Sequence, residues 1–155
     1  MKTSRYFFTA LLVILTLAAV TTTVSASPPS GQTPSNLVIG RLSDPTNVNV
    51  DNIKVRSNDS ADLAMVTVTY TAGGYSGWHT HPGILFVVVV SGSVVRTVKC
   101  QAPRTYVAGQ SFVESDAQPA GEVQNASTTA SAVLQVTQIV PQGSVRRVEA
   151  VQPAC

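Results

Sequence analysis

The two histidines of the chain, His79 and His81, are the residues whose type and spacing most clearly predict chemistry. They are the only histidines among the 155 residues, and a single residue separates them. On a β-strand, side chains two residues apart leave the same face, so both imidazoles would point into one space. Neutral imidazole binds Zn, Mn, Fe, Cu and Ni. The spacing therefore predicts a divalent-metal site with His79 and His81 as ligands, the identity of the metal being open.

A firm protein metal site usually has three or four ligands, so other residues should contribute. The candidates are Glu114, Glu122 and Gln124, with Asp116 close to them in sequence. Gln124 would offer only a weak amide oxygen. For any one of the acids, the simpler interpretation is a solvated loop residue. For the histidines, the alternative is an inherited site that holds hydrogen bonds or water in place of a metal.

Three further side chains near these candidates have a functional and a simpler interpretation. Arg96 and Arg104 could bind the carboxylate of a ligand, although isolated surface arginines more often bind water. Trp78 precedes the first histidine, and by strand alternation it faces away from both imidazoles. Packing on the outer face is therefore its better interpretation.

The apolar run over residues 84–90 must position the histidines, because it follows them after a Pro-Gly turn. A continuous apolar run of this length predicts a strand that is buried on both faces. Leu85, Val87 and Val89 share one face, and the alternate residues share the other. If the first set lines a barrel, the second set needs cover from another sheet or another subunit.

The rest of the chain also favours short strands. Apolar alternation or apolar runs, punctuated by Gly and Pro, occur over residues 37–39, 48–55, 62–71, 94–99, 110–114, 122–125, 131–140 and 145–148. Residues 91–93 resemble a hairpin turn. No window shows a helical repeat of 3.6 residues, so the pattern predicts an all-β sandwich or barrel.

The first 26 residues predict a secretory signal peptide. A short basic start is followed by an apolar stretch, and small residues at Val24 to Ala26 suit cleavage after Ala26. Residues 27–35 hold three prolines and small polar residues, which predicts a flexible linker before a single domain over 36–155. The expected location is therefore extracellular or periplasmic, with no membrane segment left after cleavage. An uncleaved N-terminal anchor is the alternative.

The charge balance argues against a nucleic-acid partner. The whole chain has ten Lys and Arg against eight Asp and Glu, but Lys2 and Arg5 would leave with the signal peptide. The mature chain then has eight of each and a net charge of zero. Without a basic run or an aromatic and basic stripe, no electrostatic footprint for DNA or RNA remains.

Cys100 and Cys155 are the two cysteines of the chain. In an oxidising compartment, two cysteines without an activating neighbour predict a structural disulfide. Such a bond would join the last residue to the middle of the domain. Closing a loop of that size stabilises the fold by about 4 kcal/mol in the chain-entropy model.

The segment around the histidines resembles the first motif of the cupin superfamily, G-x5-H-x-H-x3,4-E-x6-G. Gly73, His79, His81 and Gly92 occupy the motif positions with matching spacing, and Leu85 occupies the position of the acid. The resemblance covers roughly residues 62–140. It implies a single-domain, cupin-type double-stranded β-barrel, or jelly roll, with His79 and His81 as ligands of an internal divalent metal.

The second cupin motif, approximately G-x5-P-x-G-x2-H-x3-N, is only partly matched. Gly109, the segment Pro119-Ala-Gly121 and Asn125 fit it. The histidine of the motif would fall on Gln124 or on Gly121, depending on the end from which it is counted. Neither is histidine, so the acid and the third histidine of metal-binding cupins do not carry over to this chain.

Three functions follow as hypotheses. The first is a secreted cupin-domain protein that binds a divalent metal, a small ligand or both through a reduced two-histidine site. The second is a metal-dependent cupin enzyme of the dioxygenase, isomerase or decarboxylase type, although no general base is evident. The third is a non-catalytic envelope or interaction protein that forms a homodimer through the apolar run at 84–90.

Overall fold

The computed structural model describes residues 26–155, and the predicted signal peptide lies almost wholly outside them. Among the described residues no helix is long and apolar enough to cross a membrane. The fold is built from strands, as predicted. They are β1 (Ser30–Leu42), β2 (Thr46–Val50), β3 (Ile53–Ser57), β4 (Ala61–Tyr75), β5 (His79–Thr80), β6 (Ile84–Ser91), β7 (Ser93–Val98), β8 (Arg104–Val107), β9 (Ser111–Ser115), β10 (Gly121–Asn125), β11 (Ala132–Pro141) and β12 (Val148–Glu149).

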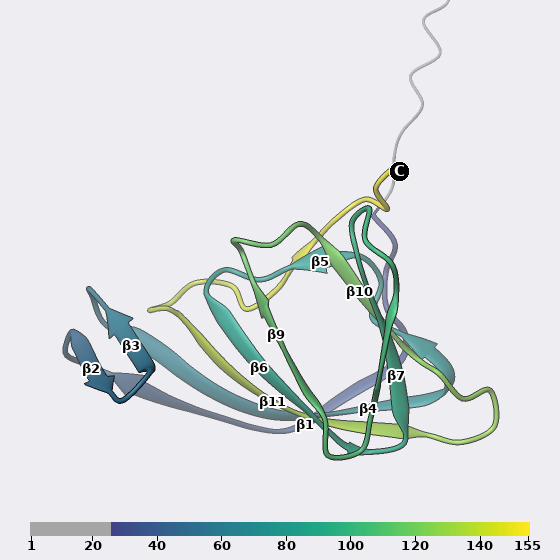
Figure 1. Cartoon of the computed structure of the whole chain (residues 1–155), viewed down its shortest axis with the longest axis horizontal. Coiled ribbons are helices and arrows are strands. Elements are labelled where there is room, and N and C mark those ends of the chain that lie inside the picture. The colour runs from purple at the N-terminus through teal and green to yellow at the C-terminus, as the bar shows by residue number, and fades with distance from the viewer. Residues whose placement is uncertain (1–25) are drawn as a thin grey trace, which may run out of the picture.

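Ten of these strands form one antiparallel sheet that curls into a nearly closed barrel (Figure 1). One half has the order β1-β4-β11-β6-β9, and the other has the order β8-β7-β10-β5-β12. A pairing between β4 and β10, at Tyr75 and Gln124, joins the two halves. The prediction of an all-β jelly-roll barrel is therefore confirmed.

Alternation along the strands divides each half into an inner and an outer face. The inner positions of β4, β6 and β11 are buried, and they form the main core with Val94, Phe112 and Val123. On β6 only alternate residues are buried, while Phe86, Val88 and Val90 are 45%, 42% and 54% exposed. The prediction that this run is buried on both faces is therefore wrong for residues 26–155, because no other layer in this part of the chain packs on its outer side.

The turn at residues 91–93 is not the predicted hairpin. β6 pairs with β9 and β11, whereas β7 pairs with β8 and β10, so the turn carries the chain from one half of the barrel to the other. Gly92 makes this close crossing possible. Its φ is +74°, and a Cβ there would lie 2.8 Å from the carbonyl oxygen of Ser131.

The predicted linker over residues 27–35 is partly a strand. Residues from Ser30 onward belong to β1, and those from Gln32 to Ser35 pair in register with β4. Two features explain the error. β1 lies at the edge of its half of the barrel and pairs with β4, so Pro34 does not interrupt a hydrogen-bond ladder with a second neighbouring strand. Its partner β4 is long, so it can extend the pairing beyond the apolar residues of β1.

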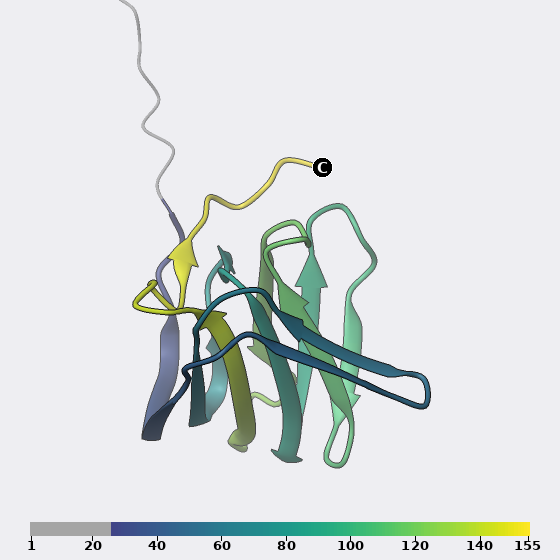
Figure 2. The same cartoon turned by 90° about the vertical axis from the view of Figure 1, so that its left-hand side faces the viewer.

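The hairpin of β2 and β3 projects from the barrel (Figures 1 and 2). Its four apolar residues, including Val50 and Ile53, are largely exposed.

The segment after β11 passes over one end of the barrel, where β12 pairs with β5 (Figure 2). The C-terminal segment therefore closes the end that holds the histidines.

The predicted disulfide between Cys100 and Cys155 is present. It fixes the end of the C-terminal segment to the turn after β7. The two cysteines are 55 residues apart, so closing the loop stabilises the fold by about 4 kcal/mol in the chain-entropy model.

We expect the double variant Cys100→Ser and Cys155→Ser to lose up to about 4 kcal/mol of unfolding free energy, because its unfolded chain is no longer cross-linked. Urea unfolding of the oxidised wild type and the double variant measures the difference. Adding a reductant should lower the wild-type midpoint to that of the variant. Equal midpoints for all three samples would contradict a stabilising bond.

Candidate metal centre

The two histidines are buried, and their ring orientation is fixed by backbone carbonyls. Nδ1 of His79 donates to the carbonyl of Gly77 at 2.8 Å, and Nδ1 of His81 donates to the carbonyl of Arg146 at 2.5 Å. Because a carbonyl oxygen can only accept, the proton lies on Nδ1 in both rings. In the neutral form of each ring, Nε2 then carries the free lone pair through which imidazole binds a metal.

The turn before His79 is shaped by close packing against the N-terminal segment. Gly77 has a φ of +67°, and a Cβ there would collide with the carbonyl of Ser27. The hydroxyl of Ser27 also accepts a hydrogen bond from the backbone N–H of Trp78 at 3.1 Å. Trp78 itself is buried. The residues just after the predicted cleavage site therefore help to hold the carbonyl that orients His79.

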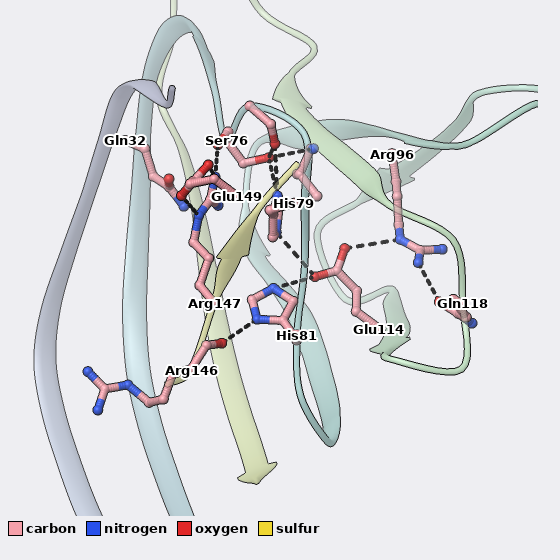
Figure 3. Close-up of polar contacts among 12 residues, drawn as sticks. Gln32, Ser76, His79, His81, Arg96, Glu114, Gln118, Arg146, Arg147 and Glu149 are labelled. Atoms are coloured by element: carbon pink, nitrogen blue, oxygen red, sulfur yellow. Dashed lines mark hydrogen bonds and ion pairs between the residues drawn. The ribbon is translucent and has the colours of Figure 1, made fainter. Parts of the chain in front are cut away.

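Glu114 on β9 completes a cluster with the two histidines (Figure 3). Its Oε2 lies 3.9 Å from Nε2 of His79 and 3.5 Å from Nε2 of His81. One ligand atom from each of the three residues lies within 4.8 Å of the others, and all three side chains are buried. The interpretation of Glu114 as a solvated loop residue is therefore wrong.

The strand register explains why Glu114 lies beside Leu85, the position at which the motif has its acid. Leu85, at the acid position of the first motif, pairs directly with Glu114 across β6 and β9. Residues that face each other across an antiparallel ladder point to the same side of the sheet. The carboxylate that position 85 does not provide thus comes from the neighbouring strand. Alternation over β9 hints at this, since Phe112 and Glu114 share one face, but only the register identifies the partner.

Arg96 on β7 holds the Glu114 carboxylate from the side opposite the histidines (Figure 3). Its Nε donates to Oε1 of Glu114 at 3.1 Å, and a terminal nitrogen donates to the amide oxygen of Gln118 at 2.7 Å. The guanidinium also lies 5.4 Å from the centre of the Phe112 ring. Arg96 is therefore a fixed partner of the acid and not an isolated surface arginine. Arg104 lies elsewhere, over the ring of Tyr106.

The remaining candidates do not join the cluster. Glu122 and Gln124 flank the buried Val123 on β10, so their side chains leave the opposite face of that strand. Gln124 is exposed, Glu122 is half-buried, and Asp116 is exposed in the turn after β9. The structure thus brings together three of the sequence-derived candidates, His79, His81 and Glu114.

Burial and charge set the protonation of this cluster in opposite directions. Burial lowers the pKa of His79 to about 4, which outweighs the attraction of the Glu114 charge. Burial also acts to raise the pKa of Glu114, but its contacts with His81 and His79 and the charge of Arg96 lower it below its usual range. At neutral pH the site therefore holds a neutral His79 and an ionised carboxylate, a pair suited to a cation.

A cavity of about 660 Å³ opens beside the cluster and is lined mostly by apolar side chains. Its lining residues include Val66, Val68, Tyr70, His79, His81, Leu85, Val87, Phe112, Glu114, Val123, Leu134, Val136, Gln138, Arg147 and Glu149. Its size is typical of a small-molecule site. The metal-binding candidates thus form the polar end of an apolar chamber.

The C-terminal segment supplies contacts that local sequence patterns do not reveal. β12 pairs Glu149 with His79, and the carboxylate of Glu149 accepts hydrogen bonds from Arg147 (Figure 3). Arg147 also donates to the carbonyl of Ser76 at 2.5 Å. Together with the Arg146 carbonyl on His81, these contacts make residues 146–149 one wall of the site. Nothing in their composition indicates this role, because it depends on the path of the chain over the barrel end.

Comparison with known proteins gives matches at the level of structure. No family model matches the sequence, and no curated protein matches it. A cupin-like protein from Thermotoga maritima shares 15% identity over 57% of this chain and 65% of its own, with a TM-score of 0.49. An oxalate oxidase in complex with glycolate shares 20% identity over 56% of this chain and 45% of its own, with a TM-score of 0.46.

A third solved structure is a conserved protein with a double-stranded β-helix domain from Klebsiella pneumoniae. It shares 16% identity over 72% of this chain and 88% of its own, with a TM-score of 0.49. The chain spans less than two thirds of the length of the first two structures. All three are similar to this chain in fold alone.

The low pKa of His79 predicts acid-sensitive stability in the metal-free protein. The unfolded chain binds a proton at His79 below about pH 6.5, whereas the folded chain resists it down to about pH 4. Unfolding free energy should therefore fall by about 2 kcal/mol between pH 7.5 and 5. Urea unfolding in the presence of a chelator measures this loss. His79→Gln should show a clearly smaller loss, and an unchanged pH dependence in that variant would contradict the assignment.

Proposed function

We propose that this chain is a secreted cupin-domain protein that binds a divalent metal ion through His79, His81 and Glu114 and a small ligand in the adjoining cavity. The observation that carries the proposal is the convergence of two Nε2 lone pairs on one buried carboxylate. A cation would satisfy all three at once.

The chemistry of the donor set supports this assignment. Two neutral imidazoles and one carboxylate suit Zn, Mn, Fe and related divalent ions, and this set is the common facial triad of non-haem iron proteins. When bound, such an ion would supply a Lewis acid with coordination positions left for a ligand. The third histidine of the second cupin motif is not needed for three protein ligands, since Glu114 restores the acid.

The residues around the three candidates are arranged as outer partners of a metal site. Backbone carbonyls orient both imidazoles, and Arg96 fixes the free oxygen of Glu114. Hydrogen bonds of this kind hold the ligating side chains in place. Their loss typically lowers metal affinity by 10- to 100-fold. Arg96 also compensates the charge of the buried carboxylate, so the fold tolerates Glu114 before a metal binds.

Secretion is part of the proposal and has separate support. The predicted signal peptide at residues 1–26 would direct the chain to an extracellular or periplasmic location. The disulfide between Cys100 and Cys155 is consistent with that compartment. N-terminal sequencing of the exported protein would test cleavage after Ala26.

The metal-binding proposal predicts that the purified protein retains close to one divalent ion per chain. His79→Ala, His81→Ala and Glu114→Gln should each lower metal affinity by at least 10-fold, because each removes one of three ligands. Elemental analysis after dialysis and competition with a chelator measure the change. Glu122→Gln, at an acid on the outer side of β10, is the matched control and should bind like the wild type. Equal metal retention in all variants would refute the site.

A metal-dependent enzyme is the second candidate, and the cavity favours it. Three protein ligands leave coordination positions open, and these would face a chamber large enough for a substrate. For this candidate, a metal-loaded wild type should turn over an organic acid or consume oxygen, and His79→Ala should lose at least 100-fold in rate while keeping its circular dichroism spectrum. A rate that survives removal of the metal would argue against it.

The homodimer stays a prediction. Its support is the exposed outer face of β6, where Phe86, Val88 and Val90 form an apolar row with Val113 on the neighbouring β9. A second copy that covers this row would bury apolar surface that one chain leaves in water.

A further inference from the structure

The cavity beside the metal-binding candidates reaches across one half of the barrel to its edge strand. Its lining residues come from every strand in the order β1-β4-β11-β6-β9. One inward row crosses these five strands and consists of Leu37, Val66, Val136, Val87 and Phe112. With strands about 4.8 Å apart, the row spans roughly 19 Å along the curved sheet. The cavity therefore extends from the metal end, at Glu114 on β9, to the edge strand β1.

Leu37 lies at the mouth of this cavity, because it lines the cavity and is nevertheless 46% exposed. A β-bulge turns it inward, since β1 has two residues, Asn36 and Leu37, opposite the single Val66 of β4. The next residue, Val38, pairs with Met65 on the outer face. Leu37 is thus an apolar side chain that water covers unless a ligand extends to the mouth.

The wall of the cavity calls for a ligand with an apolar body. Two polar pairs in the wall are already closed: the amide of Gln32 donates to the Tyr70 hydroxyl at 3.0 Å, and Arg147 donates to the carboxylate of Glu149. Apolar side chains supply most of the remaining wall. Polar groups along the body of a ligand would lose water there without gaining partners, which is unfavourable.

The charges around the cavity favour an anionic group at one end of the ligand. Glu114 is paired with Arg96, and Glu149 is paired with Arg147, so both acids are balanced before a metal binds. A divalent ion held by Glu114 and two neutral imidazoles would add two positive charges at the buried end. A carboxylate would offset this charge. The guanidinium of Arg146, which also lines the cavity, points away from the histidines and offers no second anion partner at that end (Figure 3).

We infer that the cavity binds an elongated monocarboxylic acid, whose carboxylate meets the metal end and whose apolar chain extends along the inner row to Leu37 at the mouth. This inference rests on the proposed metal site at His79, His81 and Glu114. It accounts for a chamber that is polar at one end and apolar along the rest of its length. It also gives the half-exposed Leu37 an apolar partner.

Calorimetric titration of the zinc-loaded protein with acetate, butanoate, octanoate and dodecanoate measures the contribution of the chain. Affinity should rise roughly two- to fourfold for each added methylene until the chain fills the cavity, because each methylene moves from water to an apolar wall. Octan-1-ol has the chain of octanoate without the charge and should bind roughly tenfold more weakly. Affinities that do not change with chain length, or equal binding of the alcohol and the acid, would overturn the inference.

The position of the chain is tested at the mouth. Leu37→Ser should weaken dodecanoate binding roughly threefold and leave acetate binding unchanged, because only the long chain contacts this side chain. Val38→Ser is the matched control, since Val38 is adjacent, 60% exposed and on the outer face, and it should bind dodecanoate like the wild type. Leu37→Met keeps an apolar side chain and should retain the affinity. Wild-type affinity in Leu37→Ser, or an equal loss in both serine variants, would contradict this placement.

The orientation of the acid is tested by removing the zinc. The advantage of octanoate over octan-1-ol should disappear in the metal-free protein. Zinc-loaded Arg146→Gln should keep that advantage, because it changes the side chain and leaves the backbone carbonyl that contacts His81. An advantage that survives metal removal and is lost in Arg146→Gln would place the carboxylate at the mouth and overturn the inference.

The failure of this inference is distinguishable from the failure of the proposed function. If the wild type retains zinc but its affinities are independent of chain length, the inferred ligand is refuted and the metal site stands. If the wild type does not retain zinc, the metal site itself fails and the inference fails with it. Elemental analysis of the titrated samples measures zinc retention.

Discussion

The pairing of β6 with β9 is the constraint on which the site depends. It places Glu114 opposite Leu85, so a carboxylate from one strand stands beside histidines that belong to a different part of the chain. A shift of one residue in this register would turn Glu114 to the outer face and bring Val113 inward. The buried faces of Phe112 and Leu85 oppose such a shift, so the apolar core and the polar cluster specify the same register.

Segments near both ends of the described chain hold the two histidines that Glu114 faces. The carbonyl of Ser27 packs on the turn that orients His79, and the carbonyl of Arg146 orients His81. The disulfide from Cys100 to Cys155 then fixes the C-terminal segment beyond β12. A barrel with two loose ends would leave both imidazoles free to rotate. Here the turn before His79 is held by a residue 51 positions from Trp78, and His81 is held by a residue 65 positions away, which couples the folding of the whole domain to the geometry of the site.

Two buried polar side chains beside the cavity differ in how their burial is compensated. Glu114 is buried with compensation from Arg96, whereas Gln138 is buried without a partner for its oxygen. Apolar residues at both positions would pack in the same row and would cost less to bury. Both polar side chains nevertheless stand in one inward-facing row with Leu85.

The sequence by itself determined the strand content, the glycine-framed pair His79 and His81, and the pairing of the two cysteines, because each rests on local pattern or on counting. It did not determine the strand character of Ser30 to Ser35, the crossing at Gly92, or the part played by Glu114. Those depend on which strands become neighbours and in which register, and a partner brought near by folding leaves no mark in local periodicity. Only the tertiary structure decided that the acid absent from Leu85 comes from the strand beside it.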